Sequence, residues 1–292
     1  MDRTTRIATP TGGLGIPLLA VLLALPTAAQ AATLEEIRER GHIRVAVADE
    51  EPYGYLDEDG EGRGAGPEVA RHLLEQLGIE RIEWQVVDFD DLIPGLEEDE
   101  FDMAAAEMAI RPDRCARVLF SEPNTSYGEG LLVRAANPHE INAYDAFAER
   151  DDIRVAVLSG ATQVDILTAL GVPESRLVAI DSNAQAIDTI LDGEAEAYAG
   201  TGLTVSQLAE RDRQVEVAQN FVDPEVDGEM VRSWGGFAFP LDAESLRDAF
   251  NEALLDYRNT QAWEDTLSGY GFTQDDILNA FRFDTDWLCS EQ

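Results

Sequence analysis

The sequence predicts an α/β protein built of two lobes, and three observations lead to that prediction. From Ile43 onward, short apolar runs typical of strands alternate with amphipathic runs typical of helices. A second series of the same kind begins at Ile153, and a late apolar run at 234–239 follows it. Alternating strands and helices imply parallel pairing with crossover helices. Each series therefore predicts one α/β lobe, and the late run is expected to return the chain to the first lobe.

The first lobe is predicted by an order of strand, helix, strand, helix, strand. Gly41 ends a helix that begins at Leu34, as glycine does at a helix C-terminus. Proline suits the first turn of a helix, and the apolar residues after Pro67 recur on one helical face. The expected elements are helices at 34–40, 67–77 and 91–97, and strands at 42–48, 82–87 and 101–106.

The second lobe is predicted from three strands with helices between them, followed by the return strand and a long amphipathic helix. The expected strands lie at 153–158, 177–180, 195–199 and 234–239, and the expected helices at 164–170, 183–191 and 244–257. We expect the chain to pass between the lobes near Asn137-Pro138 and again at 232–236. Lobe one then comprises residues 32–136 and 233–292, and lobe two comprises residues 137–232.

Residues 1–31 have the pattern of a secretion signal. Arg3 and Arg6 supply a charged start, 16–25 is a short apolar run, and Ala29-Gln30-Ala31 is a small-residue cleavage site. The apolar run is too short to span a bilayer. The mature chain is therefore expected to begin near Ala32 and to reside in the periplasm.

The chain is strongly acidic. It contains 58 Asp and Glu residues against 21 basic residues, all of them Arg, for a formal charge of −37. Such a surface repels itself unless salt screens it, so we interpret it as the adaptation of a halophile to a saline medium. It argues against nucleic acids and anionic membranes as partners, since both require basic patches. A hydrophobic content of 45% also argues against an acidic disordered chain.

The segment 101–123 carries the clearest functional signal. A buried strand there is followed by a polar loop that contains Arg114. Ligands of open α/β sheets bind beyond the carboxyl ends of the strands, and the arginine fork matches a carboxylate. Arg114 is therefore a candidate for holding an anionic group of a ligand. The alternative is a surface arginine paired with Asp113 or Glu107.

Other loops at strand ends supply further ligand candidates. Glu50 and Tyr53 follow the first strand, and Phe89 follows the strand at 82–87. Tyr53 and Phe89 can clasp a cation by cation–π attraction, with Glu50 adding a charge-assisted hydrogen bond. The alternative is that both rings belong to the core. Thr162 precedes a helix whose free N–H groups attract a carboxylate, and the alternative is a threonine that only caps this helix.

Patterns of catalysis and metal binding are absent from the sequence. His42, His72 and His139 have no metal-ligand spacing, and there is no nucleophile elbow or phosphate-binding loop. We therefore expect no enzyme activity, no cofactor and no metal.

The two cysteines of the chain are Cys115 and Cys289. In a protein bound for an oxidising compartment they are expected to form a disulfide, which would join the C-terminal tail to the loop of Arg114. The alternative is a pair of free thiols.

Segment 101–123, FDMAAAEMAIRPDRCARVLFSEP, resembles the corresponding segment of periplasmic solute-binding proteins of ABC importers, and the resemblance covers nearly the whole mature chain. It implies a type II clamshell of two lobes, in which hinge closure traps a solute for delivery to a membrane permease. It also implies that Arg114 holds the carboxylate of an amino-acid-like solute. A monomer is expected.

Several features resemble the ectoine- and hydroxyectoine-binding proteins in particular. Amino-acid-binding members carry an Asp for the α-ammonium group at the position where this chain has Thr201. The Glu-x-Pro-Tyr loop at 50–53, the Pro-x-Arg-Cys run at 112–115 and Gly-Phe-Thr at 271–273 also match the ectoine type. The resemblance implies a zwitterionic compatible solute, with its carboxylate at Arg114 and its amidinium against the aromatic rings.

Two positions depart from that pattern. Glu107 stands where the resembled proteins have glycine, and Ala109 stands where they have an aromatic wall of the cation box. Trp234, at the return passage, is a candidate for the missing wall. A polar or cationic amino acid is therefore the alternative ligand. The alternative class is a secreted enzyme resembling cyclohexadienyl dehydratase, with Glu107 as its acid.

Overall fold

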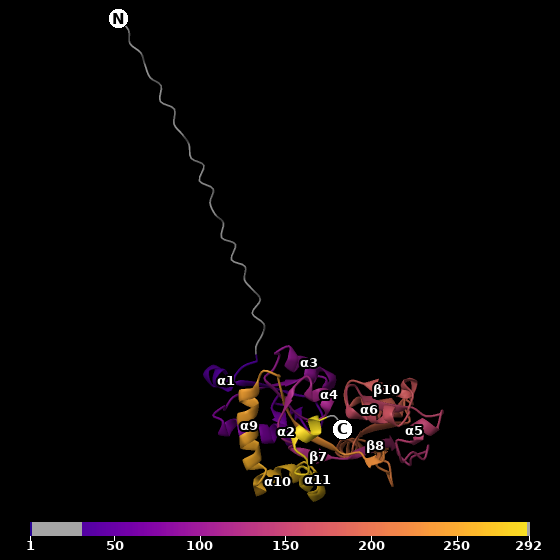
Figure 1. Cartoon of the computed structure of the whole chain (residues 1–292). Helices are drawn as coiled ribbons and strands as arrows, with labels where there is room; N and C mark the ends of the chain where they lie inside the picture. Colours follow the sequence, from indigo (N-terminus) through magenta and orange to yellow (C-terminus); the bar gives the residue numbers. More distant parts are fainter. Residues whose placement is uncertain (2–30, 291–292) are drawn as a thin grey trace.

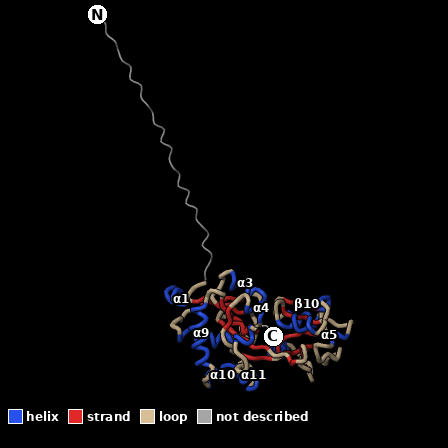
Figure 2. Tube along the Cα trace, viewed as in Figure 1, coloured by secondary structure: helices blue, strands red, loops and turns tan. Residues whose placement is uncertain are grey.

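The computed structural model describes Met1 and residues 31–290, which fold into two α/β lobes lying side by side (Figure 1). Each lobe has strands at its centre and helices around them (Figure 2). The predicted two-lobed α/β class is thereby confirmed. The secretion signal expected at residues 1–31 lies outside the described residues except for its two ends. None of the described helices is long and apolar enough to cross a membrane.

Lobe one is built around a mixed sheet in the strand order β4-β1-β5-β15-β6, with β7 paired to β15. Strand β1 runs parallel to β4 and β5, whereas β15 runs antiparallel to β5. The parallel strands therefore end at one edge of the sheet, where ligand-binding loops are placed in α/β proteins. The strands are β1 Ile43–Val47, β4 Ile82–Val86, β5 Met103–Ala109, β6 Leu119–Phe120, β7 Thr125–Tyr127 and β15 Ser233–Phe239, and a separate hairpin joins β2 Tyr55–Leu56 to β3 Gly62–Arg63.

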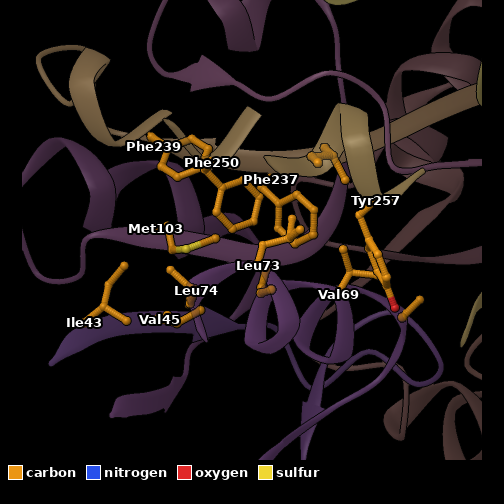
Figure 3. Close-up of a cluster of buried hydrophobic side chains, with 14 of the residues drawn as sticks. Ile43, Val45, Val69, Leu73, Leu74, Met103, Phe237, Phe239, Phe250 and Tyr257 are labelled. Atoms are coloured by element: carbon orange, nitrogen blue, oxygen red, sulfur yellow. The ribbon is translucent and has the colours of Figure 1, made fainter. Parts of the chain in front are cut away.

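The helices of lobe one enclose this sheet in two core clusters. In the larger cluster, Leu73 and Leu74 of α2 lie among Met103, Phe237 and Phe250 (Figure 3). Each such side chain contributes roughly 1.5–3 kcal/mol by leaving water. The second cluster packs α3 and α12 against the other side chains of β5. The helices are α1 Leu34–Arg40, α2 Ala65–Gln76, η1 Phe89–Asp91, α3 Leu92–Glu97, α4 Pro112–Cys115, α9 Glu244–Tyr257, α10 Gln261–Gly269, α11 Gln274–Asn279 and α12 Thr285–Cys289.

Lobe two contains a second mixed sheet in the order β10-β9-β11-β8-β12. Strand β9 runs parallel to β10 and β11, and β8 runs antiparallel to β11. Its strands are β8 Glu129–Arg134, β9 Val155–Leu158, β10 Leu177–Ile180, β11 Ala197–Thr201 and β12 Val215–Val217, with a hairpin of β13 Glu225–Val226 and β14 Glu229–Met230. The helices are α5 Ala146–Glu149, α6 Thr162–Ala169, η2 Glu174–Arg176, α7 Gln185–Leu191 and α8 Gly202–Arg211.

The first passage between the lobes lies earlier in the chain than expected. Strand β7 pairs within the sheet of lobe one, whereas β8 pairs within the sheet of lobe two. The chain therefore leaves lobe one at Gly128, and not near Asn137-Pro138. Only this glycine separates the two strands, so no loop in the sequence marks the passage. Asn137, with a φ of 39°, instead forms the turn that follows β8.

Strand β5 extends further than the strand expected at 101–106. It continues to Ala109, so Glu107 and Ala109 lie within a fully buried strand and not in a loop. The polar Glu107 suggested a strand end in the sequence, but pairing with β15 continues to Ala109. Both residues are therefore fixed by the sheet.

The expected disulfide is present. Cys115 at the end of α4 is bonded to Cys289 at the end of α12, with their Cα atoms 5.7 Å apart. The bond attaches the C-terminal helix to the helix that carries Arg114. The alternative of two free thiols is excluded in this structure.

Candidate functional site

A small cavity lies between the two lobes at the carboxyl ends of the strands. Lobe one contributes the loop after β1, η1, β5, α4 and β7, and lobe two contributes the start of α6 and the end of β11. Its volume of about 20 Å³ is close to the space that one water molecule needs. The lining residues are Glu50, Tyr53, Phe89, Glu107, Ala109, Arg114, Tyr127, Ala161, Thr162, Gln163 and Thr201.

The lobes are closed on one another around this cavity. The hydroxyl of Tyr53 donates to Oγ1 of Thr201 across the boundary, at 2.8 Å. At a second point, Oγ1 of Thr204 donates to Oε1 of Glu50 at 3.2 Å. Farther out, ion pairs of Arg111 with Asp165 and of Arg211 with Glu51 also join the lobes. A solute larger than water therefore reaches the cavity only when the lobes separate.

Arg114 is the one basic residue among the cavity-lining residues of the described chain. Its side chain is buried, with 5% of the residue exposed, and it forms no ion pair within the described residues. The guanidinium donates to the carbonyls of Ala109, at 3.1 Å, and of Gly160 in lobe two, at 3.0 Å. Burial lowers its pKa to about 10. The alternative of a surface arginine paired with Asp113 is wrong, because Asp113 pairs with Arg111.

Glu50 and Glu107 bring two carboxyl groups to the cavity wall. Both are buried, and no arginine pairs with either of them in the described part of the chain. Burial raises the pKa of Glu50 to about 7, although the hydrogen bond that Thr204 donates to it opposes the shift. Burial likewise raises the pKa of Glu107 to about 7 against its bonds from Thr125 and Asn124. The cavity is therefore lined by more acidic than basic groups.

The aromatic rings are arranged differently from the expected clasp. Tyr53 is buried and meets Tyr127 edge to face, with ring centroids 5.1 Å apart. Phe89 lies under the guanidinium of Arg114, whose Cζ is 5.5 Å from the ring centroid. Both rings reach the cavity, as expected, but the ring beside Tyr53 is Tyr127. A cation–π contact inside the protein thus already uses one face of Phe89.

The remaining candidates fall into two groups. Thr162 is the first residue of α6, and Ala161 occupies its N-cap position without a side-chain bond, so the hydroxyl of Thr162 does not cap this helix. Thr201 caps α8 by accepting from the amide of Thr204. Trp234 does not line the cavity: its indole donates to the carbonyl of Asn279 and lies against Phe283. Trp234 therefore supplies no wall of this cavity, although it lines a neighbouring pocket together with Ala109 and Thr162.

Four residues at or directly behind the cavity were not recognised in the sequence. Tyr127 and Gln163 line the cavity. Thr204 and Glu129 do not line it but form hydrogen bonds with the lining residues Glu50 and Gln163. Glu129 accepts from Nε2 of Gln163 at 2.6 Å, and its other oxygen, Oε1, is buried without a hydrogen-bond partner among the described residues. The misplaced lobe passage concealed Tyr127 and Glu129, since both flank Gly128.

Glu129 gives a pH prediction that requires no ligand. Burial raises its pKa to about 7, so the folded state holds a proton that the unfolded state loses above its ordinary pKa near 4.5. The contribution of this group is thus fully present below about pH 4.5 and is lost as the pH rises through 7. Glu129→Gln cannot titrate, so the free energy of unfolding of the variant minus that of the wild type should increase by about 2–3 kcal/mol between pH 5 and pH 8.5.

Urea unfolding of both proteins at the two pH values measures this difference. Glu97→Gln is a suitable control, because Glu97 is half-exposed and its pKa is lowered by Arg117. If the free energies of unfolding of Glu129→Gln and of the wild type differ by the same amount at both pH values, the pKa of Glu129 is not raised in the folded protein.

Comparison with known proteins defines the family. The family model described as bacterial extracellular solute-binding proteins, family 3, matches residues 43–273. A probable amino-acid ABC transporter periplasmic-binding protein, y4tE of Sinorhizobium fredii, is 44% identical over 98% of this chain and 93% of its own length.

Two solved structures share the fold. EhuB in complex with hydroxyectoine has a TM-score of 0.80 at 28% identity, over 89% of this chain and 98% of that chain. AncCDT-1, an ancestral amino acid-binding protein and precursor of cyclohexadienyl dehydratase, has a TM-score of 0.70 at 24% identity, over 81% and 98% of the two chains. The chain therefore belongs to family 3 of the bacterial extracellular solute-binding proteins, with the type II periplasmic-binding-protein fold, and it is a binding protein and not an enzyme.

Proposed function

We propose that this chain captures a polar or cationic amino-acid-like solute between its lobes, outside the cytoplasm, and delivers it to the permease of an ABC importer. The observation that carries the proposal is Arg114, a buried guanidinium at the cavity wall without a carboxylate partner in the described part of the chain. A buried charge without a partner is costly, and a carboxylate supplied by a solute would compensate it. The name of y4tE, an amino-acid-type binding protein, supports the same class of solute.

The carboxylate end of the solute is assigned to Arg114 and the start of α6. Thr162 lines the cavity and is not the N-cap of α6, and Ala161 and Gln163 at the start of this helix line the cavity beside it. Amides at a helix start favour negative charge. Arg114 already donates to Gly160 in lobe two, so a carboxylate bound here would touch both lobes and stabilise their closed arrangement.

The ammonium end is assigned to Glu50. Amino-acid-binding members of the family resembled by this chain use an Asp at the position of Thr201. Here Thr201 caps α8 and bonds Tyr53. The next hydroxyl in that turn, Thr204, donates to the carboxylate of Glu50, which also lines the cavity. A carboxylate from lobe one thus lies close to the place where the acidic residue of lobe two is missing.

Ectoine or hydroxyectoine is the second candidate. The TM-score of 0.80 with the hydroxyectoine complex of EhuB and the threonine at position 201 favour it. Two features disfavour it. Ala109 provides no aromatic wall, and Trp234 does not replace that wall, because it lies outside the cavity. Glu107 adds a second carboxylate that a solute with a single cation would leave without a partner.

A calorimetric panel separates the two candidates. The purified protein is titrated at low and at about 1 M salt with the proteinogenic amino acids, ectoine, hydroxyectoine and glycine betaine, since salt screens the acidic surface more than buried pairs. The proposal expects one or a few amino acids to bind at least about tenfold tighter than ectoine, a difference of about 1.4 kcal/mol. Tighter binding of ectoine would establish the second candidate, and binding of no carboxylated solute would refute both.

A further inference from the structure

Glu107 occupies a backbone position that disfavours glutamate. Its φ is 50°, in the left-handed region, although it lies within the strand β5. Residues other than glycine seldom adopt this conformation, because the left-handed backbone strains any residue with a Cβ. Glycine would avoid that strain entirely. A glutamate at this position therefore points to a contribution from its side chain.

The carboxylate of Glu107 is held in one orientation by two neutral groups. Nδ2 of Asn124 donates to Oε1 at 2.7 Å, and Oγ1 of Thr125 donates to Oε2 at 2.7 Å. Asn124 is itself fixed by Nε1 of Trp263, which donates to its Oδ1 at 2.8 Å. The hydroxyl of Tyr127 donates to the main-chain carbonyl of Glu107 at 2.9 Å. The residue is 2% exposed and lines the inter-lobe cavity.

None of these neighbours is a cation. Each carboxylate oxygen of Glu107 has one hydrogen bond to a neutral donor, and a carboxylate oxygen has capacity for a second. In the described residues, the groups of opposite charge at the cavity are Arg114 on one side and Glu50 with Glu107 on the other. An amino acid with a neutral side chain carries one carboxylate for Arg114 and one ammonium for Glu50. Glu107 is then the one carboxylate of the cavity wall that such a solute leaves without a cation.

We propose that Glu107 is the specificity-determining residue of the site and that it binds a positively charged side chain, so that the solute is a cationic amino acid. This inference rests on the proposed function, because it assigns the two ends of the amino acid to Arg114 and Glu50. The orientation of Glu107 is set before binding by Asn124 and Thr125, so little ordering accompanies the formation of the new ion pair. A neutral side chain of the same shape would leave this buried carboxylate without a counter-charge, which discriminates against it.

The test uses pairs of solutes that differ mainly in side-chain charge. Arginine is compared with citrulline, and lysine with norleucine, by calorimetric titration of the wild type. The proposal expects the cationic member of at least one pair to bind at least about thirtyfold tighter, because a buried charge is costly to leave without its partner. Glu107→Gln should reduce that ratio below about tenfold, while the affinity for the neutral member changes much less. Glu97→Gln, remote from the cavity and paired with Arg117, should keep the wild-type ratio.

A purely structural role for Glu107 gives a different result. Glutamine has only one acceptor oxygen for Asn124 and Thr125, so a structural role would weaken both members of each pair equally and leave the ratio unchanged. Glu107→Gly removes the side chain at a φ that suits glycine, so it tests the ratio without backbone strain if Glu107→Gln folds poorly. Circular dichroism and thermal unfolding confirm that each variant is folded.

The outcomes also separate this inference from the proposed function. If the wild type binds neutral amino acids as tightly as cationic ones, or if Glu107→Gln and Glu107→Gly keep the preference, the role of Glu107 is refuted and amino-acid binding stands. If no carboxylated solute binds at all, the proposed function and this inference both fail.

Discussion

Arg114→Ala is expected to weaken the binding of every carboxylated solute strongly. The variant removes the one basic group of the cavity wall in the described chain, together with its bond to the carbonyl of Gly160 in lobe two. The solute loses its counter-charge, and the closed arrangement loses an inter-lobe contact. Truncating one partner of a buried charge pair costs about 2–5 kcal/mol, so calorimetry should show a loss of at least about thirtyfold.

Arg111→Ala is the matched control for this prediction. Arg111 lies on the neighbouring turn and also joins the lobes, by an ion pair with Asp165 at 2.7 Å, but it does not line the cavity. Its loss should weaken binding by less than about tenfold, since a partly exposed ion pair contributes about 0–1 kcal/mol. Arg114→Lys keeps the charge but not the planar fork, so it should restore only part of the affinity. Wild-type affinity in Arg114→Ala would place the carboxylate site elsewhere.

The second large effect concerns stability. Reducing the Cys115–Cys289 bond frees the C-terminal helix from α4 and releases a loop that spans 174 residues of sequence separation. Disulfides that close loops of this kind typically contribute about 2–4 kcal/mol, chiefly by restricting the unfolded chain. We therefore expect the free energy of unfolding of Cys115→Ser/Cys289→Ser to be lower than that of the wild type by that amount, with a lower urea midpoint. Reduction of the wild type should cause the same loss.

Solute affinity should be affected much less than stability in this variant. Arg114 keeps its hydrogen bond to Ala109 on β5, and Leu288 of α12 stays buried in the second core cluster without the disulfide. Non-reducing mass spectrometry verifies the bond in the wild type. Identical urea midpoints for the wild type and the double serine variant would show that the tail contributes nothing to the stability of lobe one.

The sequence allowed prediction of those features that depend on local pattern. Alternating apolar runs predicted both lobes, and the position of Arg114 after a buried strand predicted its place at the sheet edge. The pairing of Cys115 with Cys289 followed from the cysteine count and the expected compartment. Every proposed ligand residue except Trp234 lines the inter-lobe cavity. Their roles in binding are still predictions, because the geometry places them without showing a solute.

The remaining features depend on contacts between distant segments. Gly128 separates two strands that belong to different sheets, and the sequence around it does not show which sheet each strand joins. Trp234 turns away from the cavity because Asn279 and Phe283, far along the chain, bind its indole. The positive φ of Glu107 likewise results from pairing with β15, and it accounts for the glycine that the resembled family carries there. Such effects are tertiary and leave no local signal.

The most direct test of the account is a double cycle on the carboxylate site. The amino acid with the highest affinity in the panel and its decarboxylated amine are titrated into the wild type and into Arg114→Ala. If Arg114 holds the solute carboxylate, the wild type binds the amino acid at least about a hundredfold tighter than the amine, and the variant shows a ratio below about tenfold, because the coupling between the two groups is removed. Equal affinities of the wild type for both solutes, or a preference that persists in Arg114→Ala, would contradict the account.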